Sequence, residues 1–526
     1  MEILSLLGTG LANVFGPYTF ALLVLGIFIG VVAGALPGIN FVNAMVLALP
    51  FTYVMQPDQA MVFLAGIYVG GIFGGSIASI LINIPGSPGS IPAAWDGYPM
   101  TKKGLAAKAL GIAIVCSAVG GLISALIMIF VSQPFAHFAL RFGAPEFFAA
   151  AVLGLISVVA IAKGQMLVSL ISLFLGLAVG AVGLDPMYGQ PRLTFGSPIL
   201  ENGISFVVVL VGMFAIGEVL YWLGEKRKQG AGQIERTRTR LPRPRELLKL
   251  KGPIARGAGI GCAIGAIPGS GAVIGAVIAY GVERQASKRG SEFGTGVEEG
   301  LAAPETAKNA TTGTATIPLL TLGIPGSAAT AIMLAALMIH GIQPGPQLFL
   351  TSAELVYTVF AGYLVANVLM IVAGLIVARG FATLMRIPPA VLFGFITILC
   401  LIGAFGVRNN IADIYICLAF GFLGYAFRRT GIPVSPLILG VILGPLAEQY
   451  FLTSMVSYGG DLTVFFTRPL SGTILGLGGV FMIWSLWPSV KDWITARRSR
   501  IEAKRRGGGA WSQRPRVPQK GRSSDI

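Results

Sequence analysis

Two kinds of Pro-Gly corner occur in this chain, and each occurs twice. Pro37-Gly38 has a counterpart 231 residues later in Pro268-Gly269, and Pro85-Gly86 has one 240 residues later in Pro325-Gly326. Each corner lies inside a long apolar stretch, where proline removes a backbone donor and interrupts a helix. An interrupted helix exposes amides that favour an anion and carbonyls that favour a small cation. The corners are therefore candidate ion-binding positions.

Small polar side chains flank these corners. Hydroxyl and amide groups can bind a carboxylate, or complete the oxygen shell of a cation, without adding a buried net charge. The residues that we expect to bind a carboxylate substrate are Asn40, Ser87, Ser90, Ser270, Asn309, Ser327 and Thr330. The residues that we expect to bind a coupling cation are Asn83, Thr312 and Thr314.

Two ionisable residues lie just before Asn309 in the same apolar segment. Ionisable residues in such segments are functional candidates by default. Glu305 and Lys308 are three positions apart, so on a helix their side chains can form an ion pair. A structural ion pair and a role in substrate binding are both compatible with this spacing.

The composition indicates a membrane protein. Of the 526 residues, 54% are hydrophobic and 11% are charged, whereas soluble domains have about 25% charged residues. Apolar runs of about 18–25 residues recur along the chain, and each is long enough to cross a bilayer. We expect an all-α polytopic membrane protein with about 12 transmembrane segments, broken or re-entrant helices among them.

The net charge of +16 is concentrated in two basic regions, which we expect to be cytoplasmic because basic loops remain on that side. The expected organisation is a first membrane repeat (1–223), a basic cytoplasmic linker (224–256), a second membrane repeat with an extra span (257–487), and a basic cytoplasmic tail (488–526). The N-terminus then lies outside and the C-terminus inside. Nucleic-acid binding is not expected, since no aromatic interleaving accompanies the basic residues.

Basic loops occupy opposite positions in the two halves. Three lysines mark 102–108, after the second corner of the first half, as cytoplasmic, whereas the equivalent 340–347 has no lysine or arginine. After the first corners the pattern reverses, because 51–58 lacks basic residues and 283–299 contains three. This swap predicts two inverted-topology repeats. Interrupted segments paired in this way are typical of the binding site of a secondary transporter.

The sequence motifs do not indicate an enzyme or a metal-binding protein. The four cysteines have neither metal-ligand nor redox spacing, and two histidines are too few for a multi-histidine site. We therefore expect neither catalysis nor a bound cofactor beyond a coupling ion. A channel or scaffold that uses the corners only as structural kinks remains the alternative to a carrier.

Five longer segments carry distinctive sequences, among them AAPETAKNATTGTATIPLLTLGIPGSAAT (302–330) and YVGGIFGGSIASILINIPGSPGS (68–90). The others are 96–104, 183–196 and 442–469. In these segments the chain resembles the large membrane subunit of the tripartite tricarboxylate transporter family. The resemblance implies a bacterial inner-membrane importer of di- or tricarboxylates or related organic acids. It also implies coupling to sodium ions or protons, a small four-helix membrane subunit and a periplasmic solute-binding protein as partners.

One position departs from the family pattern. The family usually has Asn-Asn where this chain has Lys308-Asn309. A lysine at this position either adds a partner for a carboxylate or occupies a site that a cation otherwise fills. The sequence leaves both possibilities open.

Overall fold

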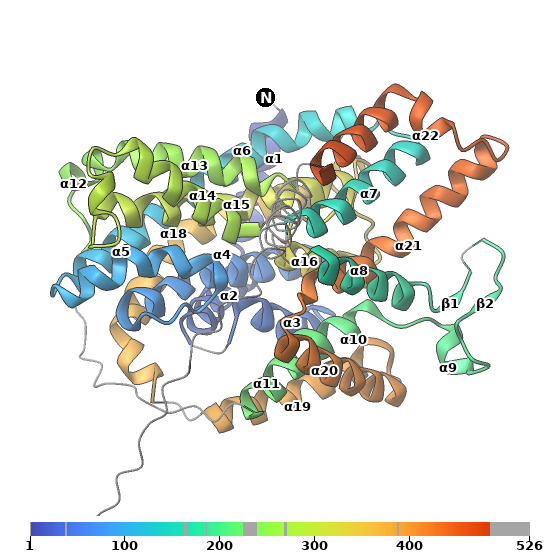
Figure 1. The fold of residues 1–526 in the computed structure, drawn as a ribbon, viewed down its shortest axis with the longest axis horizontal. Helices are drawn as coiled ribbons and strands as arrows, with labels where there is room; N and C mark the ends of the chain where they lie inside the picture. Colours follow the sequence, from blue (N-terminus) through green and yellow to red (C-terminus); the bar gives the residue numbers. More distant parts are fainter. Residues whose placement is uncertain are drawn as a thin grey trace, which may run out of the picture.

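A computed structural model describes residues 2–36, 39–161, 166–185, 187–224, 239–267, 271–386 and 389–483. This part of the chain is almost entirely helical (Figure 1). Its one sheet is the antiparallel pair β1 (Gly183–Leu184) and β2 (Pro191–Arg192). Eight described helices are long and apolar enough to cross a membrane, and shorter apolar helices accompany them. The prediction of an all-α polytopic membrane protein is confirmed.

The first half contains four long apolar helices and the shorter pieces between them. Its elements are α1 (Glu2–Val14), α2 (Pro17–Ala35), α3 (Phe41–Thr52), α4 (Pro57–Ile82), η1 (Pro88–Ser90), α5 (Ile91–Lys102), α6 (Ala106–Ala139), α7 (Ala144–Ile161), α8 (Met166–Gly180), α9 (Pro198–Glu201), α10 (Phe206–Leu210), the π-helical turn η2 (Val211–Ile216) and α11 (Gly217–Gly224). The segment α10–η2–α11 runs without a break and is one of the candidate spans.

The second half repeats this order. Its elements are α12 (Pro244–Lys249), α13 (Lys251–Gly265), α14 (Gly271–Ala286), η3 (Gly290–Glu292), α15 (Glu298–Leu322), α16 (Ala328–Ile339), α17 (Leu348–Thr351), α18 (Ala353–Leu384), α19 (Pro389–Arg408), α20 (Ile411–Thr430), α21 (Val434–Ser457) and α22 (Val464–Thr467). Helix α13 begins within the predicted linker 224–256, of which 225–238 lie outside the described residues, as does the whole tail 488–526.

The backbone shows the internal repeat directly. Helices α4 and α15 both end at a residue in the left-handed conformation, Asn83 (φ 56°) and Gly323 (φ 73°), which are 240 positions apart. Glycine and asparagine are the residues that adopt this conformation most readily. Helices α5 and α16 also end alike, because Lys103 and His340 share φ −84° and ψ 7°. The two Pro-Gly-Ser corners therefore lie between equivalent helix pairs.

The inner helices approach one another through small residues. Helix α2 packs along α4, and a Cβ on Gly34 would overlap backbone atoms of Gly71 and Gly75. Helix α13 packs along α15 in the same way, with Gly261 against the backbone of Ala307. Small residues at helix interfaces allow such contact in membrane proteins, where close van der Waals packing contributes strongly to association.

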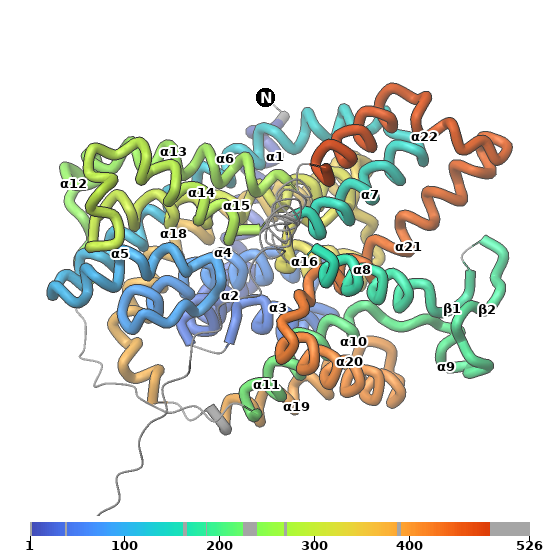
Figure 2. Tube along the Cα trace, viewed as in Figure 1, coloured from blue at the N-terminus to red at the C-terminus, as the bar shows by residue number. Residues whose placement is uncertain are grey.

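The two repeats are interleaved rather than placed side by side. Helix α6 of the first repeat packs against α15 of the second, and α18 of the second packs against α4 of the first. The late helices are exchanged as well, since α21 lies against α7 and α8, and α20 lies against η2 and α11 (Figures 1 and 2). Residues of either repeat therefore contribute to the same interior.

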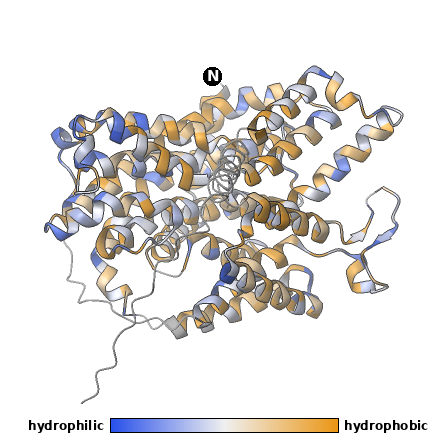
Figure 3. Cartoon of the chain, viewed as in Figure 1, coloured by the Kyte–Doolittle hydropathy of each residue, from blue (hydrophilic) through white to orange (hydrophobic). Residues whose placement is uncertain are grey.

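Loops from non-equivalent positions of the repeats lie together. The Lys103 ammonium donates to the carbonyl of Thr295 (2.6 Å), and Lys108 pairs with Glu298. The first contact joins the loop after α5 to the loop between α14 and α15, and the second joins the starts of α6 and α15; polar residues gather at this end of the helices in Figure 3. Parallel repeats would place equivalent loops on one side, whereas repeats related by an axis in the membrane plane bring non-equivalent loops together. The contacts thus agree with inverted repeats.

Candidate functional site

The second corner of the first repeat reaches the surface. Asn83, Ile84 and Pro85 are exposed, whereas Gly86 is buried and its amide donates to the carbonyl of Gly75 (3.2 Å). A Cβ on Gly86 would overlap the carbonyl oxygen of Gly34, so only glycine fits between α2 and α4.

Two buried serines follow this corner. The Oγ atoms of Ser87 and Ser90 lie 2.9 Å apart and form a hydrogen bond with each other. This pair presents two hydroxyl groups at the base of an exposed turn.

The matching corner of the second repeat is enclosed. Ile324, Pro325 and Gly326 are all buried. Ser327 begins α16 with a capping box, in which its Oγ accepts from the amide of Thr330 (3.2 Å) and Thr330 Oγ1 accepts from the amide of Ser327 (2.8 Å). Both predicted hydroxyls are therefore adjacent, and both are used in starting the helix.

The first corners of the repeats lie largely outside the described residues. Pro37 and Gly38, with Pro268, Gly269 and Ser270, cannot be placed for this reason. Asn40 follows the first of these corners and is half-buried. Its Oδ1 accepts from the amide of Val42 (3.2 Å), so the side chain caps α3.

Each second corner lies against the helix that follows a first corner of the other repeat. The 3₁₀ turn η1 contacts α14, with Gly89 opposite Ala272. Helix α16 contacts α3 in the matching way. We call the first pairing, Asn83–Ser90 with the start of α14, corner region A. We call the second, Gly323–Thr330 with the start of α3, corner region B.

Corner region B has a tyrosine from the opposite repeat in contact with its serine. The Oη of Tyr68, on α4, lies 3.4 Å from Ser327 Oγ. The ring of Tyr68 stacks on Phe41 at the start of α3, with ring centroids 5.8 Å apart. Tyr68 thus connects α3, α4 and α16 at one point.

A buried charged network lies where α15 meets α4 and α6. The Glu305 carboxylate accepts from Ser76 Oγ at Oε1 (2.6 Å) and from Ser117 Oγ at Oε2 (2.9 Å). The Lys308 ammonium lies 3.0 Å from Glu305 Oε1 and also donates to Ser76 Oγ. Asn309 Nδ2 donates to Ser117 Oγ (2.8 Å), and all five side chains are buried.

The predicted cation ligands are separated in the structure. Thr312 and Thr314 are buried within α15, where their hydroxyl protons are donated to the carbonyls of Asn309 (2.8 Å) and Ala310 (3.0 Å). Asn83 is exposed at the end of α4. Among the described residues, the contacts bring Asn309 to the charged network but do not join Asn83 to either threonine.

Sequence reasoning missed three residues of this interior. Tyr68, Ser76 and Ser117 contact the predicted residues, yet none adjoins a Pro-Gly corner. Tyr68 and Ser76, both on α4, could have been found from the 240-residue offset between the repeats. This offset aligns Tyr68 with Lys308 and Ser76 with Thr316. Aligning the two repeats along their full length, instead of at the corners alone, identifies these positions.

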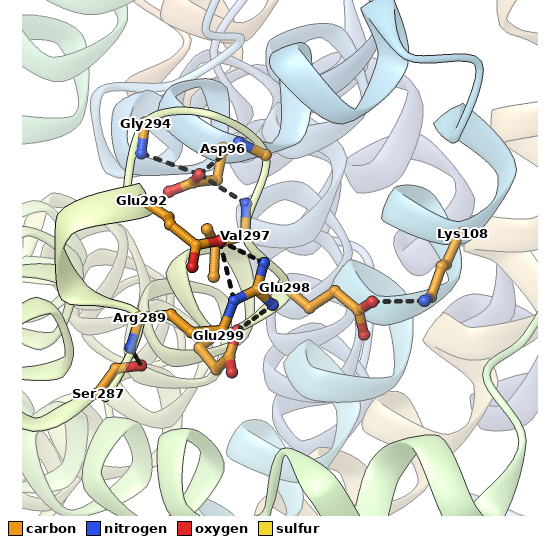
Figure 4. Close-up of polar contacts among 10 residues, drawn as sticks. Asp96, Lys108, Ser287, Arg289, Glu292, Gly294, Val297, Glu298 and Glu299 are labelled. Carbon is orange, nitrogen blue, oxygen red and sulfur yellow. Dashed lines mark hydrogen bonds and ion pairs between the residues drawn. The ribbon is translucent and has the colours of Figure 1, made fainter.

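A buried aspartate holds the start of α15 (Figure 4). Asp96, on α5, accepts from the amides of Gly294 (3.0 Å), Gly296 (2.8 Å) and Val297 (2.8 Å) at Oδ1, and from Tyr280 Oη (3.0 Å) at Oδ2. Charge-assisted bonds of this kind are stronger than neutral ones. The helix that carries Glu305 and Lys308 is therefore fixed to the first repeat at its N-terminal end.

Outside the apolar helices, the loop before α15 contains an exposed ion pair of its own. The Arg289 guanidinium donates to Glu292 (2.7 Å) and lowers the pKa of that carboxyl. Within the described residues, no group of three or more His, Cys, Asp or Glu side chains is arranged to hold a metal ion. The charged network of α15 is instead made of serine hydroxyls, the Asn309 amide and the Glu305–Lys308 ion pair.

Comparison with known proteins identifies the family. Residues 20–439 match the model of the Tripartite tricarboxylate transporter TctA family. An "Uncharacterized 52.8 kDa protein in TAR-I ttuC' 3'region" of Agrobacterium vitis is 35% identical over 492 residues, which cover 94% of this chain and 98% of that protein. An "Uncharacterized protein in TAR-II ttuC' 3'region" of the same organism is 38% identical over 232 residues, covering 44% of this chain and 96% of that protein.

No solved structure matches this chain. The family match extends over most of both predicted repeats, and it includes both Pro-Gly-Ser corners and the charged network of α15. With its interleaved helices and duplicated corners, the chain belongs to the tripartite tricarboxylate transporter TctA family, as the large membrane subunit of such a transporter.

Proposed function

We propose that this subunit imports a di- or tricarboxylate, or a related organic acid, across the bacterial inner membrane, coupled to sodium ions or protons. A periplasmic solute-binding protein delivers the substrate, and a small four-helix membrane subunit completes the complex. The observation that carries the proposal is the pairing of broken helices across the repeats in corner regions A and B. In each of the two corner regions, a helix end from one repeat therefore lies beside a helix end from the other, among polar side chains.

The chemistry of the corner regions suits a carboxylate. Helix N-termini offer amides with partial positive charge, and the flanking serines and threonine offer hydroxyls. The buried lysine nearest these regions along the chain, Lys308, is already paired with Glu305. Anion binding in the corner regions therefore depends on amides and hydroxyls, which hold a carboxylate by charge-assisted hydrogen bonds.

The test is uptake by the reconstituted complex. The large and small membrane subunits are placed in vesicles with the binding protein outside, and a radiolabelled acid that the binding protein retains is supplied. We expect uptake that requires both the binding protein and an inward sodium or proton gradient. Uptake that persists without the binding protein, or that only equilibrates the acid without a gradient, contradicts the proposal and favours a channel.

The proposed orientation has the N-terminus outside and the C-terminus in the cytoplasm. It is supported by the contacts between two basic segments of different repeats, because basic loops usually remain in the cytoplasm. Met55→Cys and Lys288→Cys lie in loops that we expect on opposite sides. An impermeant thiol reagent added to intact cells should label position 55 and not position 288, and equal labelling of both contradicts the orientation.

A further inference from the structure

The Glu305 carboxylate is enclosed by hydrogen-bond donors from three helices. Ser76 comes from α4, Ser117 comes from α6, and Lys308 lies one turn after Glu305 on α15. Every one of these side chains is at most 1% exposed. A carboxylate with so little access to water needs a positive partner, because an isolated buried charge is strongly unfavourable.

The positive partner is the ammonium group of Lys308, a compact charge with oxygen atoms as its neighbours. The Lys308 ammonium contacts Glu305 Oε1 and Ser76 Oγ, a carboxylate and a hydroxyl oxygen. Lysine, unlike arginine, presents its charge on one small group without a planar fork. Oxygen ligands of this kind are also those that hard metal cations prefer.

A further oxygen of the network has no partner. Asn309 Oδ1 is buried and accepts no hydrogen bond from the described residues, while its Nδ2 donates to Ser117 Oγ and to the Glu305 carbonyl. Buried acceptors are normally paired, so an unpaired one calls for an explanation. Asn309 lies one turn after Glu305 on α15 and shares Ser117 with it. A small cation bound beside Glu305 could therefore give Asn309 Oδ1 the partner that Lys308 does not provide.

We propose that Glu305, Ser76 and Asn309 form a site for a monovalent metal cation, and that the Lys308 ammonium is its permanent occupant in this chain. The ammonium neutralises Glu305 but is tethered to α15, so it cannot leave during a transport cycle. Given the cation coupling of the proposed function, the exchangeable ion must bind elsewhere. The lysine at this site therefore neutralises the Glu305 charge, but the site adds no ion to the number transported with each substrate molecule.

Removing the lysine should open the site. Lys308→Ala leaves a buried carboxylate together with the space of three methylenes and an ammonium group. Lys308→Met removes the same charge but fills most of that space, so it is the matched control. Both variants are purified as full-length chains without substrate, and their melting temperatures are compared in sodium, potassium, lithium and choline chloride at equal ionic strength.

We expect a cation-specific gain for the alanine variant alone. Its melting temperature in sodium chloride should exceed that in choline chloride by about 2–4 °C more than the wild-type difference. Adding Glu305→Gln to the alanine variant should remove the gain, because the charged ligand is lost. If Lys308→Ala is unstable in choline, recovery of folded protein is compared between purifications in sodium and choline, and higher recovery in sodium supports the site.

Several results overturn the inference. One is that Lys308→Ala has the same melting temperature in all four salts. Another is that sodium raises the melting temperature of Lys308→Met or of the double variant by as much as that of Lys308→Ala. A third is that lower pH alone restores the stability of Lys308→Ala, which would indicate that a proton neutralises Glu305. These measurements need no transport, so they stand apart from the proposed function. If the wild-type complex shows no cation-coupled uptake while sodium still raises the melting temperature of Lys308→Ala, the proposed import is refuted and the cation site is supported.

Discussion

Corner regions A and B share a backbone plan and differ in exposure. Both follow a helix that ends in the left-handed conformation, and both continue through Pro-Gly-Ser. Ile84 in region A is 37% exposed, whereas its equivalent in region B, Ile324, is 4% exposed. One sequence motif therefore lies in two environments within a single structure. In an alternating-access carrier this is expected, because the two halves of a repeat pair are not equivalent in any one state.

The surroundings explain the difference. Region B is covered by α3 and by Tyr68, and in the loop after α16 the amide of Gly345 donates to the carbonyl of Leu320 (3.0 Å). In region A the serine hydroxyls form a hydrogen bond with each other, and no tyrosine of the described residues donates to them. Residues 83–85 of region A are thus exposed, whereas the equivalent residues 323–325 of region B are buried.

Replacing the corner glycines should give the largest effects. A Cβ on Gly86 would overlap the carbonyl oxygen of Gly34, whereas a Cβ on Gly326 would lie 2.8 Å from the carbonyl oxygen of Ala315. Overpacking of this kind costs about 1–3 kcal/mol and occasionally more. We expect Gly86→Ala to lower the melting temperature and the yield of folded protein more than Gly326→Ala. The reverse order contradicts the tighter fit of region A between α2 and α4.

Thiol labelling should separate the regions by exposure. In a background without the four native cysteines, Ile84→Cys should react with a water-soluble maleimide much faster than Ile324→Cys, since only the former side chain is accessible. A bound acid should slow the reaction at position 84 if it binds at region A. Equal rates at both positions in the absence of substrate would show that the difference between the regions does not persist in solution.

The corners and the fold class were predictable from the sequence because they depend on local chemistry. Proline and glycine interrupt an apolar helix wherever they occur, and long apolar runs must be helical in a membrane. The partners of Glu305 were not predictable in this way. Ser76 lies 229 positions and Ser117 188 positions from it, and only the packing of α15 on α4 and α6 brings them together.

The predicted cation ligands show the same limit. Asn83, Thr312 and Thr314 share a polar character, but a residue type does not determine which side of a helix it occupies. The threonine hydroxyls donate within α15, as threonines in apolar helices commonly do. Asn83 is explained by its left-handed conformation at the end of α4. Whether any of the three binds a cation stays a prediction.

Removing the corner serines should sharpen the comparison further. If each hydroxyl contacts the substrate carboxylate, Ser87→Ala and Ser327→Ala should each weaken binding by about 1.5–3 kcal/mol, or one to two decades in affinity. Ser327 also caps α16, so its replacement should cost about 1 kcal/mol of stability as well. Substrate titration and thermal unfolding of the same preparations measure the two effects. Lys308→Asn is the counter-test, since loss of uptake there with normal transport in both serine variants would assign binding to the lysine charge.

The smallest effect is expected for Tyr68→Phe. This change keeps the ring that stacks on Phe41 and removes only the hydroxyl, whose distance of 3.4 Å from Ser327 Oγ indicates a weak hydrogen bond. We expect a loss of about 0.5–1 kcal/mol in stability, and faster labelling of Ile324→Cys because region B is less firmly closed. Ser87 in region A has no tyrosine partner among the described contacts, so labelling of Ile84→Cys should not change. A change at position 84 and none at position 324 would show that Tyr68 acts through α4 as a whole, and not through its contact with region B.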